Sequence, residues 1–485
     1  MSVALALGVD SSTQSTKVEA RDIGTGIVVA RASAPHPPCA PPASEQDPEA
    51  WWTALVSAIG VLALEAPLDQ VVAMAVGGQQ HGLVLVDDDG VVVRPAKLWN
   101  DTTSAVEAAE LVAELGPANW AEGCGSVPVA AFTITKLAWM ARHEPDALAR
   151  TARVMLPHDY LTWRLTDRHV TDRGDASGTG WFDPTTNLYR TDLLATAVER
   201  PDTWLDRLPT VVEPDAVAGV LSPTAAATLG LRADVVVGPG TGDNMAAALG
   251  LGLRPGDVAM SLGTSGTVYA VSHTPTADPS ACVAGFADAS GRYLPLVCTL
   301  NATRVTDTMA AWLGTDAVGL SELAGQAPAG SSGVVLVPYF DGERTPNLPD
   351  AKGSVFGLNT ETSRYDLARA AHDGVLCGLL DGLDALTAAG VDTEGRLHLI
   401  GGGARSAAYQ QQCADLREAP ITIADAEEAV ATGAALQAAA LCSDSEAAEL
   451  AAAWSLGAGS IVEPAPDSNG TEIRAAYAAV ADLST

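Results

Sequence analysis

The sequence predicts a mixed α/β protein made of two duplicated domains with a cleft between them. Its 485 residues exceed the size of one typical hydrophobic core, which favours two domains of roughly 200 to 250 residues each. A polar hairpin loop occurs twice along the chain, and an apolar strand that ends in a glycine pair also occurs twice. Segments with helical periodicity lie between these features and would cover a sheet.

The first polar hairpin lies at the start of the chain. Residues 4–9 form an apolar run, the polar turn DSSTQST follows from Asp10, and a second short apolar run begins at Lys17. Two apolar runs joined by a polar turn are typical of a β-hairpin whose hydroxyl and amide groups point into one space. A single copy would equally fit an ordinary Ser/Thr turn.

A second copy of the hairpin favours a duplicated functional loop. Residues 258–271, VAMSLGTSGTVYAV, align with the first hairpin. The alignment pairs Ser261 with Asp10, Gly263 with Ser12, and Thr264 with Thr13. Residues 71–82, VVAMAVGGQQHG, and residues 397–406, LHLIGGGARS, are both apolar strands that end in glycine pairs. The chain therefore reads as a diverged duplication.

Helical periodicity and chain breakers divide the sequence further. Segments of helical period are predicted at residues 48–64, 102–115, 132–142 and 363–388. Glycine and proline in GLGLRPGD, residues 250–257, would end a helix just before the second hairpin. We therefore predict an N-terminal domain of residues 1–251 and a C-terminal domain of residues 252–485.

Residues 235–252, VVVGPGTGDNMAAALGLG, place an acid between a glycine loop and a helix of small residues. Asp243 at that point fits a helix N-cap, whose carboxylate accepts a backbone N–H of the first turn. It also fits a catalytic base at the mouth of a cleft, where glycines let a substrate approach the backbone. The stretch alone leaves both interpretations open.

The charge of the chain limits its partners. It has 27 basic and 59 acidic residues, a formal net charge of −32, which argues against nucleic acid and anionic membranes. Such a surface also repels a nucleotide unless helix N-termini, amide nests or a metal ion reverse the potential locally. Any phosphate site must therefore be created by groups in direct contact with the phosphate, and not by the overall charge of the surface.

Cysteine usage and hydropathy suggest a cytoplasmic protein without a membrane anchor. The seven cysteines are odd in number and include no CxxC pair, so we expect buried thiols in a reducing compartment instead of disulfides or a zinc cluster. No basic region precedes Asp10, which argues against a secretory signal. The alanine-rich run at residues 429–443 is shorter than the ~20 residues that a spanning helix needs.

Two facing polar loops suit phosphoryl transfer. The reaction needs donors for the β- and γ-phosphate oxygens, a carboxylate for Mg²⁺ and a base for the attacking hydroxyl. These parts can come from Asp10, Thr13, Gly263, Thr264 and Asp243. The chain contains no GxxxxGK[ST] motif and no HRD or DFG set, so neither P-loop nor protein-kinase chemistry is indicated.

Several motifs, in this order, resemble the FGGY carbohydrate kinases of the actin-like ATPase superfamily, most closely the xylulokinase branch. The resemblance spans nearly the whole chain and implies two actin-like, ribonuclease H-like domains. The motifs are SEQDPEAWW (44–52), GGQQHG (77–82), LWND (98–101), LPHDYLTWRLT (156–166), GTGDN (240–244), SLGTSG (261–266), GERTP (342–346) and GGGARS (401–406).

The resemblance implies roles for the acids and the first loop. Asp243 matches the family's catalytic base, and Asp10 matches the aspartate expected to hold Mg²⁺ through water. Thr13 is expected to face the phosphates, with Lys17 neutralising charge near them. The loop departs from the family's usual glycine-containing form, because residues 11–14 read SSTQ.

The resemblance also implies substrate contacts in both halves. Gln80 and His81 match a Met-His pair that contacts the sugar in xylulokinases, and Asn244 is a further sugar contact. In the second half, Gly263 and Thr264 match the loop at the nucleotide phosphates. The adenosine-side loop is matched by Gly402, Gly403 and Ser406, and Trp312 stands where the branch places a tryptophan near the nucleotide base. Trp312 equally fits a plain helix core.

The expected activity is ATP-dependent phosphorylation of D-xylulose to D-xylulose 5-phosphate by direct in-line transfer with Mg²⁺. The alternatives are another FGGY kinase, acting on ribulose, a pentitol or glycerol, and a non-kinase actin-like ATPase. The family also suggests a homodimer.

Overall fold

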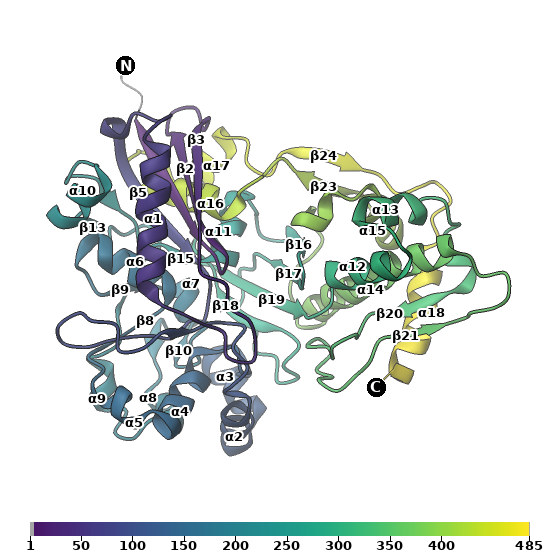
Figure 1. Cartoon of the computed structure of the whole chain (residues 1–485), viewed down its shortest axis with the longest axis horizontal. Helices are drawn as coiled ribbons and strands as arrows, with labels where there is room; N and C mark the ends of the chain where they lie inside the picture. The colour runs from purple at the N-terminus through teal and green to yellow at the C-terminus, as the bar shows by residue number, and fades with distance from the viewer. Residues whose placement is uncertain (1–3, 485) are drawn as a thin grey trace.

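Two seven-stranded sheets form the framework of the chain, one in each of two lobes (Figure 1). The computed structural model describes residues 4–484. The first sheet runs in the order β13 (Gly219–Val220), β14 (Val236–Val237), β5 (Val71–Gly78), β1 (Leu5–Ser11), β2 (Ser15–Asp22) and β3 (Val28–Pro35), with β15 (Thr241–Gly242) also paired to β5. The second runs in the order β18 (Ala284–Ala287), β19 (Tyr293–Thr299), β17 (Gly266–Ala270), β16 (Val258–Leu262), β22 (Leu397–Ile400), β23 (Ile421–Ala424) and β24 (Gly459–Val462).

Helices and short strand pairs surround the two sheets. The helices of the first half are α1 (Pro48–Leu62), α2 (Ala105–Leu115), α3 (Pro117–Cys124), α4 (Thr133–His143), α5 (Pro145–Ala149), α6 (Pro157–Thr166), α7 (Arg173–Ala176), α8 (Thr191–Ala197), α9 (Asp202–Leu205), α10 (Pro223–Leu229) and α11 (Asp243–Gly250). Those of the second half are α12 (Thr303–Trp312), α13 (Ala317–Ala324), α14 (Arg364–Ala388), α15 (Ala407–Arg417), α16 (Ala429–Ala440), α17 (Ala447–Ala453) and α18 (Gly470–Ala481). The short pairs are β4 (Glu45–Gln46) with β7 (Ala96–Lys97), β6 (Val84–Val86) with β8 (Arg153–Met155), β9 (Val170–Asp172) with β12 (Thr210–Val212), β10 (Phe182–Asp183) with β11 (Leu188–Tyr189), and β20 (Val335–Val337) with β21 (Ser354–Phe356).

The pairing of the strands confirms the predicted duplication. In the first lobe, β1 is antiparallel to β2 and parallel to β5. In the second lobe, β16 is antiparallel to β17 and parallel to β22. Both predicted hairpins and both strands that end in glycine pairs therefore occupy equivalent places, one set in each sheet.

The central strand β1 is buried on both faces, because its alternate side chains enter two different apolar cores. Leu5, Leu7 and Val9 belong to the apolar core that includes residues of α1, whereas Ala6 belongs to the core formed with α16. Because successive strand residues point to opposite faces, a run without polar interruption suits a strand covered on both sides. Helices from the two halves of the chain thus sandwich the same strand.

The four predicted helices are present with small changes at their ends. The segments predicted at 48–64, 102–115, 132–142 and 363–388 form α1, α2, α4 and α14. Asp47 accepts the N–H of Glu49 before α1, and Ser363 caps α14, so local capping residues fix these starts. Asp10 was expected in a turn but belongs to β1, because β1 stays paired with β2 and β5 as far as Ser11.

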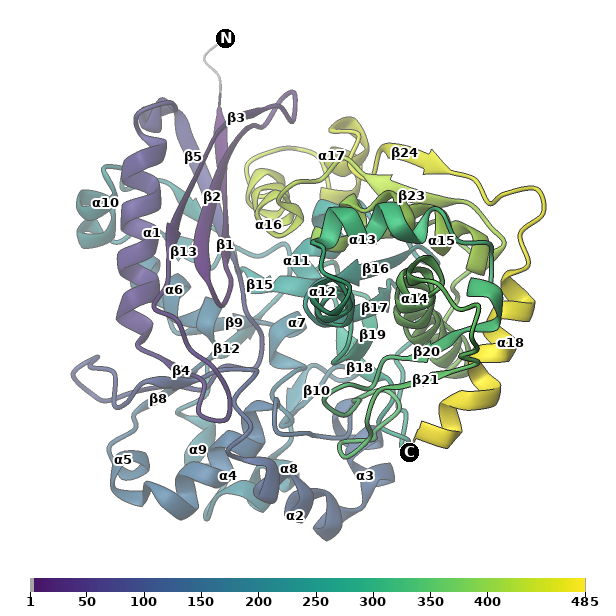
Figure 2. The same ribbon diagram turned by 45° about the vertical axis from the view of Figure 1, so that its right-hand side comes forward.

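Helix α16 comes from the second half of the chain but packs against the first sheet and α11 (Figure 2). The backbone of α16 lies very close to β1 and to α11. If Gly8 carried a Cβ atom, that atom would lie 1.8 Å from the carbonyl oxygen of Ala431, and a Cβ atom on Gly433 would lie 1.8 Å from the carbonyl oxygen of Ala246. Helix α17 packs on the same face of the sheet, and Trp454 at its end belongs to the apolar core that α16 forms with β1 and β5. The predicted boundary at residues 251 and 252 stays a prediction, since the later segment returns to the first lobe.

The cysteines all lie within residues 4–484, the part of the chain that the structure describes. All seven cysteines are free, and Cys124, Cys377 and Cys413 are buried as expected. Cys442 is exposed, so the expectation of burial was wrong there, because it follows the end of α16 at the surface. Within this range no helix is both long enough and apolar enough to cross a membrane.

The contact between α11 and α16 predicts opposite effects for the same substitution in two helices. We expect Gly433→Ala to lower the free energy of unfolding by about 1–3 kcal/mol, because the added methyl overlaps backbone of α11. The control is Gly60→Ala in α1, where nothing lies within 4 Å of the added atom. Better helix propensity should raise its stability by about 0.5–1 kcal/mol. Urea unfolding of both variants checks this, and equal effects would contradict the close packing.

Candidate active site

Three neighbouring parallel strands bring the predicted residues of the first half to one edge of the sheet. The register pairs Asp10 of β1 with Gly77 of β5, and Gly77 with Thr241 of β15. Asp10 therefore lies at the end of β1, the Gln80–His81 pair follows β5, and Asp243 follows β15. The carboxyl ends of parallel strands are the usual place for ligands in α/β sheets.

Asp243 is the first residue of α11, and Gly242 occupies the N-cap position. The N-cap interpretation of Asp243 is therefore wrong, because the strand β15 extends to Gly242 and the helix starts directly after it. One carboxylate oxygen, Oδ1, accepts two hydrogen bonds from Asn244, from the backbone N–H at 2.8 Å and from Nδ2 at 2.9 Å. The other oxygen, Oδ2, takes no hydrogen bond from the described residues.

The surroundings of Asp243 favour its protonated form more than water does. Burial, together with the negative charges of Asp10 and Asp175, raises the pKa of Asp243 to about 7. The two hydrogen bonds from Asn244 act in the opposite direction. A carboxylate with a pKa near neutrality is a stronger base than an ordinary aspartate, and about half of it is ionised at neutral pH.

Asp10 is almost completely buried, and its surroundings suit a metal held jointly with phosphates. Its Oδ1 accepts the Ser12 hydroxyl at 2.8 Å, and its Oδ2 lies 3.8 Å from Lys17 Nζ. Burial raises the pKa of Asp10 to about 6. No cluster of three or more His, Cys, Asp or Glu that could hold a metal occurs among residues 4–484. Mg²⁺ commonly binds through one or two carboxylates plus substrate phosphates, so a single carboxylate fits that ion.

The other two predicted residues of the first loop have protein partners. Lys17 Nζ lies 2.6 Å from Glu428, just before α16, so this ion pair links the two halves of the chain. The Thr13 hydroxyl donates to Gln79 Oε1 at 3.1 Å and accepts from Trp99 Nε1 at 2.9 Å. The expected phosphate contacts of Thr13 and Lys17 stay predictions.

His81 is held in one orientation and one protonation state. Its ring stacks on Phe132 with centroids 4.9 Å apart, and its Nδ1 lies 2.8 Å from the carbonyl oxygen of Gly178. A carbonyl can only accept, so Nδ1 carries the proton and Nε2 is left as an acceptor. Burial, with the positive charge of Lys136 adding to it, lowers the pKa of His81 to about 3.

Lys136 supports His81 and was missed by the sequence analysis. It is fully buried in α4 and donates to the carbonyl oxygens of His81, at 3.0 Å, and Ala131. This contact fixes His81 at a φ of 66°, a left-handed conformation that is uncommon for residues other than glycine. A lysine within an otherwise buried helix segment, residues 133–137, was the available signal.

The amides of Gln80 and Asn244 meet beside the base. Asn244 Nδ2 donates to Gln80 Oε1 at 2.9 Å as well as to Asp243. Gln80 is only 5% exposed, and its Nε2 has no hydrogen-bond partner among the described residues. Asn244 is partly exposed. The expected sugar contacts of both residues stay predictions.

The second lobe repeats this arrangement with glycine loops in place of acids. Ser261 of β16 pairs with Ile400 of β22, so the turn at Gly263 and the loop at Gly402–Arg405 follow neighbouring strand ends. A Cβ on Gly403 would lie 2.8 Å from Leu262 Cβ, which keeps the two loops in contact. Thr264 is exposed in its turn. The structure thus brings Gly263, Thr264, Gly402 and Gly403 together.

Ser406 follows the second of these loops, and Trp312 lies at the far end of α12, whose first residue, Thr303, donates its backbone N–H to Gly263. The Ser406 hydroxyl accepts the N–H of Tyr409 at the start of α15 and donates to Ser321, so it has a structural role whatever else it does. Trp312 ends α12, is 67% exposed and stacks on Phe340 with centroids 5.6 Å apart. Its exposure excludes the helix-core interpretation and leaves the ring available to a ligand.

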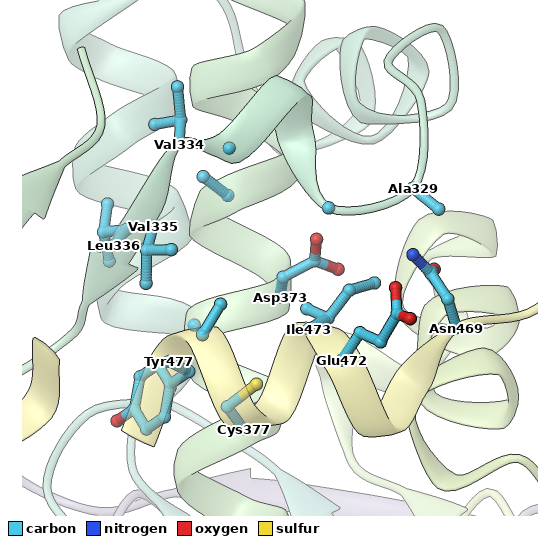
Figure 3. A pocket seen from close by; sticks show the side chains of 15 residues that line it. Ala329, Val334, Val335, Leu336, Asp373, Cys377, Asn469, Glu472, Ile473 and Tyr477 are labelled. Carbon is cyan, nitrogen blue, oxygen red and sulfur yellow. The ribbon is translucent and has the colours of Figure 1, made fainter. Parts of the chain in front are cut away.

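A cavity of about 240 Å³ lies elsewhere in the second lobe, between α14, α18 and β20 (Figure 3). Asp373 and Cys377 of α14 and Tyr477 of α18 are among its lining residues. No predicted site residue lines it. This cavity is therefore separate from the strand-end site.

Comparison with known proteins agrees with the motifs. Residues 5–250 match the N-terminal domain of the FGGY family of carbohydrate kinases, and residues 258–442 match its C-terminal domain. The chain belongs to this family. The predicted pair of actin-like domains is confirmed by the fold that FGGY kinases share.

Individual FGGY kinases match nearly the whole chain. A xylulose kinase of Streptomyces coelicolor is 48% identical over 463 residues, which cover 95% of this chain and 92% of the relative. A xylulose kinase of Escherichia coli is 37% identical over 84% of each chain. The crystal structure of a xylulose kinase from Bifidobacterium adolescentis superposes with a TM-score of 0.85 at 38% identity, covering 99% of each chain.

Two buried histidines of this FGGY kinase should differ in charge at neutral pH, one neutral and one positive. We expect His81 to stay neutral with the proton on Nδ1, because its pKa is about 3. His158 should stay doubly protonated: burial disfavours its charged form, but three carboxylates outweigh that effect and raise its pKa to about 9. NMR of ¹⁵N-labelled imidazoles between pH 5 and 8 measures both states, with His81→Asn assigning one signal. Titration of either ring between pH 5 and 8 would contradict this arrangement.

Proposed function

We propose that this chain transfers the γ-phosphate of ATP to D-xylulose and gives D-xylulose 5-phosphate. The family supports a carbohydrate kinase, and near full-length relatives named xylulose kinase support the substrate. The observation that carries the mechanism is Asp243: a carboxylate with a pKa of about 7 and one uncommitted oxygen, at the strand ends where a ligand is expected.

Asp243 acts as the general base in this proposal. Its Oδ2 takes the proton of the sugar's 5-hydroxyl while that oxygen forms a bond to the γ-phosphorus, and the bond from the γ-phosphorus to the β–γ bridging oxygen breaks. ADP leaves with the bridging oxygen, so no phosphoenzyme forms. Asn244 holds Oδ1 through two N–H groups and so keeps Oδ2 turned toward the substrate.

The sugar lies against the loop after β5 in this proposal. His81 Nε2 is an acceptor, because Nδ1 donates to Gly178, and it can bind one sugar hydroxyl. Asn244 offers its side-chain Oδ1 to the sugar, since its side-chain hydrogen bonds to Gln80 and Asp243 both use Nδ2. Gln80 was also expected at the sugar, and it lies beside Asn244, because its Oε1 accepts from Asn244 Nδ2 at 2.9 Å.

The nucleotide lies between the two lobes in this proposal. Thr13, Lys17, Gly263 and Thr264 face the phosphates, and the adenosine side is formed by Gly402, Gly403, Ser406 and the exposed ring of Trp312. Asp10 would hold Mg²⁺, which supplies charge neutralisation on the phosphates when bound. Arg344, from the second half of the chain, lies close enough to His81 and Lys136 for its positive charge to lower the pKa of both. The homodimer and the cytoplasmic location stay predictions.

A sugar panel tests the substrate. We expect ADP release with D-xylulose to exceed that with ribulose, pentitols or glycerol by at least about 10-fold in kcat/KM, because a site built for one set of hydroxyls leaves polar groups unpaired with another. A coupled ADP assay measures this. Preference for another sugar would assign a different FGGY kinase, and ADP release without any sugar would favour the ATPase alternative.

Removing the carboxylate tests the base. We expect Asp243→Ala and Asp243→Asn to reduce kcat by about 10²–10⁴-fold while sugar binding by calorimetry stays within a few-fold. In the wild type, kcat should fall as the pH drops below about 7, because protonated Asp243 cannot accept the sugar proton. The matched control is Asp202→Asn, at the exposed first residue of α9. Retained turnover in either Asp243 variant would reject the assignment.

A further inference from the structure

A strand of the second lobe reaches the loop that carries His81. The ring of His81 contacts two phenylalanine rings, Phe132 of the first lobe with centroids 4.9 Å apart and Phe286 of β18 with centroids 5.6 Å apart. The two phenylalanine rings also contact each other, with centroids 6.0 Å apart. Three rings from two lobes therefore form one cluster at the residue that the proposed function places beside the sugar.

Backbone hydrogen bonds hold β18 against the first lobe. It is the edge strand of the second sheet and lies beside α7 (Figure 1). The N–H of Gly285 donates to the carbonyl oxygen of Gly125 at 2.9 Å, and the N–H of Ala287 donates to Ser177 Oγ at 2.9 Å. A Cβ on Gly285 would lie 2.5 Å from the oxygen of Gly125, so the close approach requires glycine. An edge strand would otherwise leave such N–H groups unpaired, so the first lobe completes this edge.

The same turn of the first lobe holds the ring of His81. Ser177 and Gly178 follow α7 in succession. Ser177 binds the N–H of Ala287 in β18, and the carbonyl oxygen of Gly178 lies 2.8 Å from His81 Nδ1. A Cβ on Gly178 would lie 2.6 Å from that nitrogen, so a larger residue would push the ring away. His81 and the strand that carries Phe286 are thus fixed by neighbouring residues of one turn.

These contacts leave the imidazole of His81 one orientation. A histidine ring can turn about its Cβ–Cγ bond, and a half turn exchanges Nδ1 with a carbon atom. The hydrogen bond to Gly178 selects one of these two orientations, and the two phenylalanine rings restrict the tilt of the imidazole. Nδ1 is therefore committed to the protein, and Nε2 is the ring nitrogen left for a sugar hydroxyl.

We propose that Phe286 is a positioning residue of the sugar site: with Phe132 it fixes the imidazole of His81 so that Nε2 faces the sugar. Sugar binding then depends on a residue of the second lobe and on the docking of the strand that carries it. The inference rests on the proposed function, in which His81 binds the sugar. Phe286 is only 2% exposed, so it acts through His81 and not by contact with the substrate.

Plain core packing is the competing role of Phe286, because the apolar cluster around it includes residues of both lobes, such as Trp120 and Tyr269. The kinetic constants separate the two roles. A residue that only fills the core changes stability and leaves the constants of the folded enzyme unchanged. Loss of an interaction made equally with substrate and transition state raises KM and leaves kcat unchanged.

The first test is Phe286→Leu, which keeps an apolar side chain and removes the ring. We expect the KM for D-xylulose, and the dissociation constant measured by calorimetry, to rise about 5–10-fold. The kcat and the KM for ATP should stay within about twofold of the wild type, because His81 touches the sugar but not the atoms that react. A coupled ADP assay measures these constants.

The matched control is Phe182→Leu in β10, a fully buried ring that contacts Tyr189. It measures what the loss of a buried ring costs in stability and should leave the KM for D-xylulose unchanged. If Phe286→Leu lowers stability like the control but leaves this KM unchanged, Phe286 is a core residue and the proposal is overturned. An equal rise in the KM for ATP would overturn it as well, because the damage would then extend beyond the sugar site.

The second test combines Phe286→Leu with His81→Asn. We expect His81→Asn alone to raise the KM for D-xylulose, and Phe286→Leu to add less than about twofold in that background, because the ring that it positions is already absent. Losses that multiply in the double variant would show that Phe286 acts on the sugar independently of His81, and would overturn the proposal.

A variant outside the ring cluster keeps the proposal testable if Phe286→Leu does not fold. Ser177→Ala removes the acceptor for the N–H of Ala287 and leaves all three rings in place. We expect it to raise the KM for D-xylulose about two- to fourfold at unchanged KM for ATP, because β18 is then held less firmly against the first lobe. An unchanged KM for D-xylulose in this variant would then decide against the proposal.

The outcome stays separate from that of the proposed function. If the wild type does not phosphorylate D-xylulose, the substrate assignment fails, and the same variants are measured with the sugar that it does phosphorylate. If His81→Asn leaves the KM for the sugar unchanged, the sugar contact of His81 fails and the positioning role fails with it. If His81→Asn raises this KM and Phe286→Leu does not, the inference alone fails.

Discussion

The register of three parallel strands is the constraint on which the site depends. Asp10, Gly77 and Thr241 are held side by side in β1, β5 and β15, and a shift of one residue in any strand would turn its last side chains to the opposite face of the sheet. The backbone hydrogen bonds of this register place two carboxylates and the loop that carries His81 at one edge. The second lobe uses the same pairing, between β16 and β22, to bring two glycine loops together.

Much of this arrangement could be predicted from the sequence because its signals are local. Apolar runs joined by polar turns marked both hairpins, and glycine pairs marked the ends of β5 and β22. The four helices were placed to within three residues at their starts and two at their ends. What could not be predicted depends on contacts distant in sequence. Lys136 meets the carbonyl of His81 across 55 residues, and Lys17 meets Glu428 across 411. No periodicity in the sequence reports such pairs.

Local charge, and not net charge, governs the site. The chain carries a net charge of −32, and Asp10, Asp175 and Asp243 lie close enough to raise the pKa of Asp243. The cations near them are each committed to a neighbour: Lys17 to Glu428 and Asp10, Lys136 to backbone carbonyls, and His158 to carboxylates. The protein thus gathers carboxylates at its strand ends, and the nearby cations are already held by other groups of the chain. In the proposed mechanism, backbone loops and neutral donors are left to receive the phosphates and the sugar.

The return of α16 and α17 to the first lobe also determines how the lobes can move. The chain passes between the lobes after α11, before α16 and after α17, so a rotation of one lobe against the other has to bend it at three places. The first and third passages touch each other: a Cβ on Gly252 would lie 3.0 Å from the carbonyl oxygen of Leu456, and a Cβ on Gly457 would lie 2.4 Å from that of Leu251. Both glycines have positive φ, 58° and 75°. Because these two passages lie side by side, a rotation of one lobe against the other would bend the chain at two neighbouring points as well as before α16.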